Sequence, residues 1–316
     1  MANSWRISAL AERHRALGSQ LEDWSGMGTA WTYASDLADE HEAIRTRAGL
    51  MDVSGLKKVH YVGPHAESLL EYATSRDISK VYPGKSVYAT MLNEAGKFVD
   101  DCVIYRTGPN AFMVVHGSGN GHEMLLRSAQ GRQVAVLFDD DLHDLSLQGP
   151  LAVDFLAEQV PGIRELPYFH HLQTRLFDRP VMISRTGYTG ERGYEIFCKA
   201  ADAPLIWDSI LDKGRDLGII PVPSPRWTGC GWRATCCSSP TTTRRCIPSP
   251  TSRPATPCGS WGWTSPCRRP RGISVAPASI GACRARSASG SSVCCSTATR
   301  RPRPATRCGP GASRSG

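Results

Sequence analysis

GKFVDDCVIYRT, residues 96–107, combines β-branched and aromatic residues with two adjacent aspartates. This composition predicts a β-strand. Side chains of a strand alternate between its two faces, so Asp100 lies on one face and Asp101 and Val103 lie on the other. Each face carries one carboxylate among apolar neighbours, and at least one carboxylate is expected to enter a partly buried site. The alternative is that both lie at an exposed strand end or pair with Arg or Lys.

The segments around this strand predict more strands and several helices. KSVYATMLN (85–93) and NAFMVVHG (110–117) are expected to be neighbouring strands, the second reached through the turn TGPN. Further strands are predicted at 51–63, 133–139, 142–149, 179–186 and 193–199, and helices at 10–18, 36–50, 65–74, 121–129, 150–160 and 201–218. Strands interleaved with helices that cover one face indicate a layered α+β fold and not a doubly wound parallel sheet. No clean internal repeat is evident.

Helical spacing in DLADEHEAIRTRAGL (36–50) aligns Leu37, His41, Ile44 and Ala48 on one side. These residues are therefore predicted to form the buried face of the helix, with His41 as a core residue and not a ligand.

The composition divides the chain into two unlike parts. The whole chain has 37 Lys and Arg against 29 Asp and Glu, a formal charge of +8. From Pro221 onward there are fifteen Arg and no Lys, Asp or Glu, so the residues before it have 22 basic against 29 acidic side chains. The same tail contains ten of the twelve cysteines and not one Leu. Such a stretch follows neither the helical nor the strand period.

Four interpretations apply to the start of this tail, RWTGCGWRATCC (226–237). A zinc site needs CxxC pairs or His ligands, and the tail has neither. A secreted disulfide scaffold needs a signal peptide, but MANSWRISALAERHRALG is charged and has no apolar segment. A basic arm for nucleic acid usually mixes Lys with Arg. The favoured hypothesis is a shifted reading frame, because shifting plausible GC-rich codons back gives Leu-Asp-Gly-Leu-Arg-Val-Glu within an ordinary helix-like segment. Residues 221–316 are then expected to be an out-of-frame, largely disordered tail.

The residues before the tail are typical of a cytoplasmic protein. No apolar run approaches the roughly 20 residues that a membrane-spanning helix needs. Only Cys102 and Cys198 occur in this part, too few for a disulfide framework. No metal site is expected, and neither a membrane nor a nucleic acid is expected as a partner.

SRTGYTGERGYEIF (184–197) has glycines at 187, 190 and 193 between two predicted strands. Glycine permits a tight turn and a close approach of backbone. The segment lacks the Lys and the following helix of a phosphate loop, which excludes nucleotide binding. Glu195 opens the second strand and could accept two parallel N–H donors from a flat, amide-like ring. The alternative is a hairpin turn with a solvated Glu.

Four motifs, in this order and spacing, resemble one known family. They are EHEAIRTRAGLMDVS (40–54), GKSVYATMLNEAGKFVDD (84–101), LSLQGP (145–150) and RTGYTGERGYEI (185–196). They are similar to motifs of the glycine cleavage system T-protein (aminomethyltransferase) and its tetrahydrofolate-binding relatives, over about residues 35–220. The back-shifted tail segment resembles the next motif of that family, Asp-Thr-Leu-Arg-Leu-Glu, and falls where that motif should begin.

The resemblance implies a fold of ferredoxin-like α+β units around a central folate channel. Residues 1–220 would be the folate-binding domain, and the C-terminal β-barrel domain of the family would be lost. Asp101 matches the catalytic residue that approaches the reactive nitrogens of tetrahydrofolate, and Glu195 matches the residue that binds the pterin N–H groups. Four further residues are expected to bind the cofactor: Tyr88, Asp100, Val103 and Tyr188.

The implied activity is tetrahydrofolate-dependent one-carbon transfer, in which an aminomethyl group on a lipoylated carrier, the H-protein, gives its methylene to tetrahydrofolate. Three positions depart from the aminomethyltransferases: Gly55 replaces a His, Lys97 replaces a Gly, and His116 replaces an Asn. These positions often differ in relatives that demethylate small molecules. A folate-dependent O-, S- or N-demethylase therefore stays open as an alternative, as does a non-catalytic folate-binding accessory protein.

Overall fold

The computed structural model describes residues 5–117 and 119–224 of the 316-residue chain. The α-helices are α1 (Ala11–Ala16), α2 (Leu37–Thr46), α3 (Ala66–Ala73), α4 (Gly121–Ala129), α5 (Ala152–Gln159) and α6 (Ala203–Lys213). Short 3-10 helices occur at Ile78–Lys80 and Arg215–Leu217. The described strands form three sheets.

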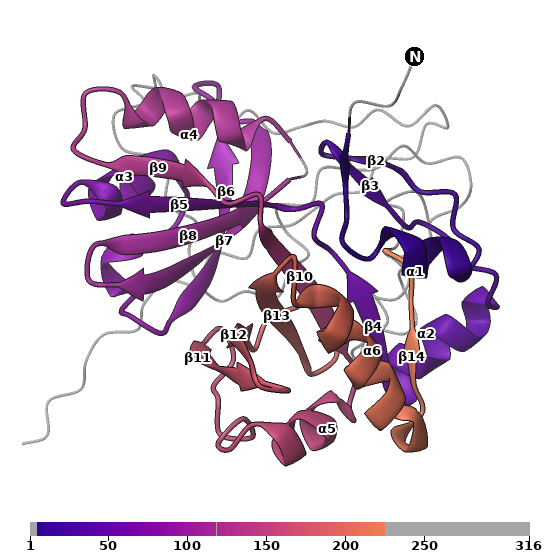
Figure 1. The fold of residues 1–316 in the computed structure, drawn as a ribbon. Helices are drawn as coiled ribbons and strands as arrows, with labels where there is room; N and C mark the ends of the chain where they lie inside the picture. Colours follow the sequence, from indigo (N-terminus) through magenta and orange to yellow (C-terminus); the bar gives the residue numbers. More distant parts are fainter. Residues whose placement is uncertain (1–4, 118, 225–316) are drawn as a thin grey trace, which may run out of the picture. The chain divides into compact units, whose positions relative to one another are not determined.

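One sheet, here called sheet I, has the order β6-β7-β8-β5-β9, and all of its neighbours are antiparallel. Its strands are β5 (Lys57–Val62), β6 (Ser86–Leu92), β7 (Phe98–Gly108), β8 (Ala111–His116) and β9 (Ala135–Phe138). Helices α3 and α4 pack on one face (Figure 1). Leu69 and Leu70 of α3 and Leu125 of α4 are fully buried there against Ile104 and Val114 of the strands. This apolar layer is the core of the half of the fold that contains sheet I.

Sheet II has the order β11-β12-β13-β10-β4-β14 and is antiparallel except for β14, which runs parallel to β4. Its strands are β4 (Ala48–Asp52), β10 (Leu142–Gln148), β11 (His171–Leu176), β12 (Arg179–Ser184), β13 (Gly193–Lys199) and β14 (Ile219–Pro221). Helices α5 and α6 cover one face, where Phe155 and Trp207 pack against Leu145, Leu147 and Ile196.

The two sheets repeat one topology. In sheet I the order along the chain is a strand, a helix, three strands, a helix and a last strand, from β5 to β9. The order from β10 to β14 in sheet II is the same, and β4 is inserted between the first and last strands of that unit. The structure thus contains an internal repeat of elements that the sequence analysis did not detect.

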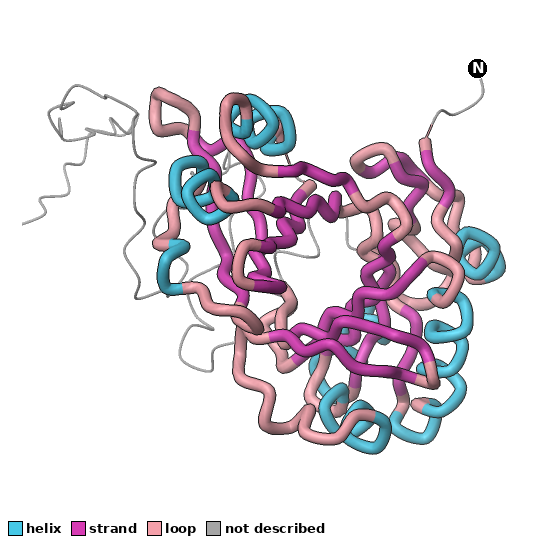
Figure 2. Tube along the Cα trace, turned by 60° about the vertical axis from the view of Figure 1, so that its left-hand side comes forward, coloured by secondary structure: helices cyan, strands magenta, loops and turns pink. Residues whose placement is uncertain are grey.

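The faces of sheets I and II that carry no helices meet each other. Tyr105, Met113 and Val115 of sheet I form a buried cluster with Met182 and Phe197 of sheet II. Figure 2 shows the strands on the inside and the helices at the periphery. We call these two meeting surfaces the inner faces.

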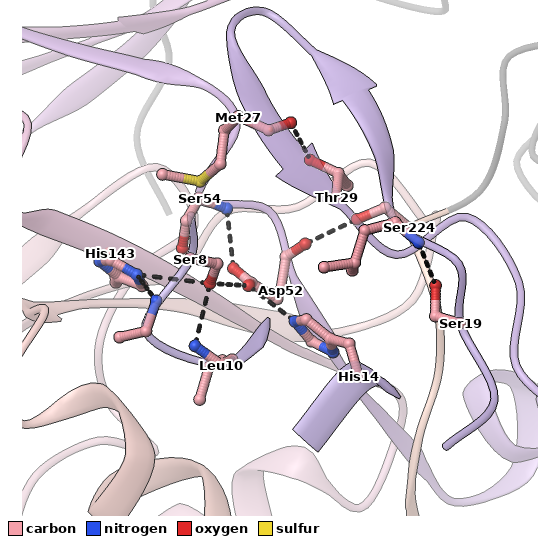
Figure 3. A network of polar contacts seen from close by, with 12 residues as sticks. Ser8, Leu10, His14, Ser19, Met27, Thr29, Asp52, Ser54, His143 and Ser224 are labelled. Carbon is pink, nitrogen blue, oxygen red and sulfur yellow. Dashed lines mark hydrogen bonds and ion pairs between the residues drawn. The ribbon is translucent and has the colours of Figure 1, made fainter. Parts of the chain in front are cut away.

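The N-terminal segment forms a small sheet of β1 (Arg6–Ile7), β3 (Met27–Thr29) and β2 (Glu22–Trp24) and is fixed to sheet II by a polar network (Figure 3). Asp52 at the end of β4 accepts a hydrogen bond from Ser8 Oγ at 2.8 Å and lies 3.0 Å from His14 Nε2. The other ring nitrogen of His14 is 2.9 Å from Tyr33 Oη. His14 is fully buried, so both of its ring nitrogens need partners within the protein, and these two contacts provide them.

Most predicted elements are confirmed, and the α+β class with them. The predicted helix 36–50 is wrong at its C-terminal end, because α2 stops at Thr46 and residues 48–52 pair with β10 as β4. Its predicted buried face is wrong in part: Ile44 and Ala48 are buried as expected, but Leu37 and His41 are exposed. Glu40 and Ala43 are buried in their place. Residues 51–63 contain parts of two strands separated by a turn. Strands β1, β2, β3, β11 and β14 were not predicted.

The predicted tail, residues 221–316, lies outside the described residues from 225 onward. Residues 221–224 continue the described fold, since Val222 donates a backbone hydrogen bond to Leu50 and Ser224 donates one to Ala30. None of the helices in the described part of the chain combines the length and apolar character needed to cross a membrane.

Candidate functional site

The inner face of sheet II is polar although it is buried. The strand alternation of β10 places Asp144, Ser146 and Gln148 on this face and Leu145 and Leu147 under the helices. All three polar side chains are fully buried. Buried polar side chains without a structural reason are unfavourable, so a polar inner face indicates a functional surface.

Glu195 lies at the centre of this face. It pairs in register with Ser146 on β10 and with Ser184 on β12. Its Oε2 accepts a hydrogen bond from Tyr105 Oη at 3.0 Å and another from Thr186 Oγ1. Among the described residues, Glu195 Oε1 makes no hydrogen bond, and the residue keeps 6% of its surface exposed.

Burial raises the pKa of Glu195, and the hydrogen bonds from Thr186 and Tyr105 oppose this shift. Both hydroxyls donate to the charged form of the carboxyl group and therefore favour it. The arrangement holds one carboxylate oxygen in place and leaves the other available as an acceptor.

Gln148 explains two glycines of the 184–197 segment. Its Nε2 donates to the carbonyl oxygen of Thr186 at 3.1 Å, and its Oε1 accepts from Thr189 Oγ1 at 3.1 Å. A Cβ atom on Gly187 would come 2.2 Å from Gln148 Oε1, and one on Gly193 would come 2.0 Å from it. These glycines are required because the Gln148 side chain occupies the space beside them.

Tyr188 covers part of the same face. The residue is 40% exposed, whereas its hydroxyl donates to Sδ of the buried Met51 at 3.7 Å. Desolvation of the hydroxyl, followed by the charges of Glu195 and Asp144, raises the pKa of Tyr188. The tyrosine hydroxyl therefore lies in the field of both carboxyl groups.

Asp101 lies on the inner face of sheet I. Asp101, Val103 and Tyr105 follow one another at alternate positions of β7, and Tyr105 is the residue that contacts Glu195. The four-residue separation of Asp101 from Tyr105 spans about 13 Å along the strand. Tyr88 on β6 pairs with Val103 and donates a hydrogen bond to Asp101 Oδ2 at 2.9 Å. The structure thus brings Asp101, Tyr88 and Val103 together on the face that meets sheet II.

Asp100 lies on the opposite face of β7, fully buried beneath α4. Its Oδ2 accepts from the backbone N–H of Gly121 at 3.1 Å and lies 3.1 Å from His116 Nδ1. Its Oδ1 accepts from the backbone N–H of Asp101 at 2.9 Å. Of the predicted site residues, this one is not brought to the inner faces.

The three positions that depart from aminomethyltransferases occupy different surroundings. A Cβ atom on Gly55 would come 2.6 Å from the Trp24 ring, so the indole fills the space of a larger side chain. Lys97 is exposed in the turn before β7. His116 is buried beside Asp100.

Four polar residues at the inner faces were not singled out from the sequence: Tyr105, Asp144, Gln148 and Thr186. Tyr105 and Asp144 were included in predicted strands, but only the packing of the two sheets places them beside Glu195. Gln148 had a usable signal, since it belongs to the quoted LSLQGP motif. Within residues 5–117 and 119–224, no group of three or more His, Cys, Asp or Glu is arranged to hold a metal ion.

Comparison with known proteins finds relatives among aminomethyltransferases and a demethylase subunit. The chain is 87% identical over 221 residues to the heme-dependent oxidative N-demethylase gamma subunit of Ectopseudomonas mendocina (strain ymp), which covers 70% of this chain and 59% of that protein. It is 37% identical over 213 residues to an aminomethyltransferase of Rubrobacter xylanophilus, covering 66% and 57% of the two chains.

A solved structure of an aminomethyltransferase is also similar to this chain. The glycine cleavage system aminomethyltransferase T from Bartonella henselae superposes with a TM-score of 0.62 and 31% identity, over 70% of this chain and 60% of that one. The α+β fold is therefore the T-protein fold that the sequence motifs implied. The chain matches somewhat under two thirds of the length of these relatives.

Residues 10–224 match the family described as GCVT N-terminal domain. Together with the relatives, this match confirms the family that the four motifs predicted. The chain belongs to the GCVT (aminomethyltransferase) family.

Proposed function

We propose that this chain binds tetrahydrofolate between its two inner faces and loads a one-carbon unit onto it, as the folate-binding part of an oxidative N-demethylase. The observation that carries the proposal is the geometry of Glu195. One oxygen is held by two hydroxyls, and the other makes no hydrogen bond within the described chain. A carboxylate fixed in this way is suited to accept N–H donors from the edge of a flat heterocycle.

The residues present fit such a ligand. Neither Tyr88 nor Tyr188 is fully buried: Tyr88 is partly buried beside Asp101 on sheet I, and Tyr188 is 40% exposed and contacts Met51 on sheet II. Bound tetrahydrofolate would supply the nitrogens that take up a carbon at the oxidation level of formaldehyde. The Glu195 carboxylate would orient the pterin edge, and aromatic rings would exclude water from its faces.

Asp101 would act at the other end of the ligand. Its carboxylate is oriented by Tyr88 at Oδ2, and its backbone N–H is held by Asp100. In this position Asp101 would hold a proton or accept one from the reacting nitrogen. Catalysis would depend mainly on positioning, because a bound carbon donor and a bound acceptor need not meet by diffusion.

The expected carbon donor follows from Gly55 and from the 87% identical relative. Gly55 stands at the position where the aminomethyltransferases have His, and the Trp24 ring occupies the space beside it. The relative is named as a subunit of an oxidative N-demethylase. Oxidative N-demethylation releases carbon as formaldehyde, so we propose that other subunits perform the oxidation and that this chain receives the carbon. Aminomethyl transfer from a lipoylated carrier is the competing activity.

Ligand binding is tested by calorimetric titration of the full 316-residue chain with tetrahydrofolate under anaerobic conditions. Glu195→Gln should weaken binding by about 100-fold, because a charged carboxylate acceptor is replaced by a neutral amide. The control is Glu165→Gln, an exposed glutamate outside the site. Equal affinities for the wild type and Glu195→Gln would contradict the proposal.

Turnover is tested by supplying tetrahydrofolate with formaldehyde or, separately, with an aminomethylated lipoyl carrier, and measuring methylene-tetrahydrofolate. We expect the chain to accelerate the formaldehyde reaction and not the carrier reaction. Asp101→Asn should lower the rate about 100-fold or more while preserving binding, whereas Asp178→Asn, at an exposed turn, should not. Binding without any acceleration would leave a folate-binding accessory protein and refute the enzymatic part.

A further inference from the structure

Asp144 is a buried carboxyl group that the proposed function does not use. It lies on the inner face of β10 and is fully buried. Neither of its carboxyl oxygens has a hydrogen-bond partner among the described residues. An ionised carboxylate in such a place is strongly disfavoured, because no donor among the described residues replaces its lost hydration.

The neighbour that matters most is Glu195. Asp144 pairs in register with Phe197 and Glu195 pairs with Ser146, so the two acids are diagonal neighbours on one face, with Cα atoms about 7–8 Å apart. Two carboxyl groups this close in a buried site do not both ionise readily. They titrate as a pair that holds one proton over a range of pH.

The hydrogen bonds decide which acid keeps the proton. Glu195 Oε2 accepts hydrogen bonds from Tyr105 and Thr186, which stabilise its charged form. Asp144 accepts none. The negative charge is therefore favoured on Glu195 and the proton on Asp144.

Among the described residues, Lys58 is the cation whose charge acts on Asp144 and could reverse this assignment. It is buried on β5 with its ammonium group donating to the carbonyl oxygen of Ser54 at 2.7 Å, and it makes no hydrogen bond to Asp144. Burial, opposed by the charges of Asp144 and Asp52, lowers the pKa of Lys58 to about 8. Burial and then the charge of Glu195 raise the pKa of Asp144, and the charge of Lys58 opposes them without reversing the direction.

The titratable groups around Asp144 come from several elements. They are Glu195 and Cys198 of β13, Lys58 of β5, Asp52 of β4, Tyr105 of β7 and Tyr188 of the glycine-rich loop. Lys58 is the cation in this set, and Glu195 is the acid on the inner face of the neighbouring strand.

We propose that Asp144 is a neutral carboxylic acid that holds the proton of the Asp144–Glu195 pair, so that Glu195 is the ionised member available to the ligand. Asp144 is thus a positioning residue: by holding the proton, it keeps the negative charge on Glu195. It keeps the proton away from the oxygen that must accept the N–H donors of the pterin. If Glu195 held the proton instead, its carboxyl group would present an O–H donor to the N–H donors of the pterin. This inference rests on the proposed function for the identity of the ligand.

The location of the proton is measured by infrared difference spectroscopy on the full chain near pH 7. The carbonyl stretching band of a protonated carboxylic acid should be present in the wild type and missing in Asp144→Asn. It should persist in Glu195→Gln, and the pH at which it disappears should fall by about one to two units because the like charge is gone. A band that is lost in Glu195→Gln and kept in Asp144→Asn would overturn the proposal.

Lys58→Met gives a second test that does not require Asp144→Asn to fold. If Asp144 is neutral, the acid band is already present and stays in Lys58→Met. If Asp144 is ionised and balanced by Lys58, the band is absent in the wild type and appears when the lysine is removed, which would refute the proposal.

Tetrahydrofolate titrations then separate this inference from the function on which it rests. Asp144→Asn should bind within about threefold of the wild type at pH 7, because the amide imitates a neutral acid, whereas Glu195→Gln should lose affinity. A large loss in Asp144→Asn would contradict a neutral Asp144. Failure of the wild type to bind would overturn the proposed ligand, and the infrared bands would still locate the proton.

Discussion

Two buried tyrosines of sheet I differ in whether their hydroxyl groups have a hydrogen-bond partner. Tyr105 Oη donates to Glu195 at 3.0 Å, whereas Tyr61 Oη is buried without a partner among the described residues. Tyr105→Phe removes a hydrogen bond to the charged form of Glu195 and so raises the pKa of that carboxyl group. The ionised form of Glu195 is proposed to bind the ligand. As the pH falls, Tyr105→Phe should therefore lose affinity at a higher pH than the wild type does.

For Tyr105→Phe we expect about tenfold weaker tetrahydrofolate binding near neutral pH and an acid limb of the binding curve displaced upward. Calorimetry from pH 5 to pH 8 measures both. Tyr61→Phe is the matched control, because it removes a hydroxyl from the same sheet on the helix-covered face. It should leave binding unchanged and stabilise the fold by about 1 kcal/mol. Identical acid limbs in the wild type and Tyr105→Phe would count against the proposed charge state.

Gly193 is the second residue with a specific expectation. A Cβ atom there would overlap the Gln148 amide at 2.0 Å, and this amide is held by Ser146, Thr186 and Thr189. Gly193→Ala should therefore lower the free energy of unfolding by about 2–3 kcal/mol, measured in urea. Gly108→Ala is the control, since its added Cβ would meet Ala111 at an ordinary 3.4 Å. Equal losses in both variants would show that the Gln148 contact is unimportant.

At the scale of elements, the polar network around Asp52 attaches α1 and β1 to sheet II. Burial would raise the pKa of Asp52, but the hydrogen bond and charge of His14 outweigh burial, with smaller contributions from His143 and Ser54, and lower it. A lowered pKa means that the carboxylate stabilises the fold above its unfolded pKa of about 3.9. The contribution is lost as the pH falls below that value.

Asp52→Asn should therefore lower the free energy of unfolding by about 3 kcal/mol at pH 7, because it breaks a buried pair. Hydrogen exchange of the α1 amides should accelerate more than exchange in α6. Urea unfolding between pH 3 and pH 7 should show the gap between wild type and variant shrinking below about pH 4. Asp178→Asn, at an exposed position, provides the baseline. A gap that stays constant with pH would exclude the assigned role of the Asp52 carboxylate.

The sequence predicted elements where the local pattern and the packing agree. Residues 121–129 form the helix that was expected, and the strand at 193–199 has the expected bounds. The prediction failed at 36–50, where a helical period continues into AGLMD, because pairing of these residues with β10 outweighs local propensity. It failed at β1, β2, β3 and β14 because strands of two or three residues carry little periodicity. It failed at β11 because HLQTRL contains only two apolar residues.

The site was predicted in part for the same reason. The four motifs identified Asp101, Glu195 and the glycines, and their proposed roles stay predictions. The contact of Tyr105 with Glu195 joins residues 90 positions apart, and the neighbourhood of Asp144 joins four strands. Such contacts follow from register and from the packing of two sheets, neither of which is visible in any one segment.

At the scale of the whole molecule, the reading frame of residues 221–316 is a proposal with a direct test. The family match ends at residue 224, close to the point where Leu and acidic residues disappear from the sequence. DNA sequencing around codons 221–226 should reveal a single-base change of frame whose correction restores Leu-Arg-Val-Glu. An intact frame, together with tail peptides in a mass spectrum of the natural protein, would disprove the shift.

The inserted position of β4 has a consequence for the order in which the chain acquires structure during synthesis. Every strand of sheet I comes from residues 57–138, so that sheet can assemble as soon as one continuous stretch has left the ribosome. Strand β4 precedes it, yet its partners β10 and β14 are synthesised roughly 90 and 170 residues later. An early strand must therefore wait with both edges unpaired while a complete neighbour forms beside it. Nascent chains halted when residue 140 has just left the ribosome should accordingly expose an unpaired, aggregation-prone strand at 48–52, and this is the stage at which we expect a chaperone to bind.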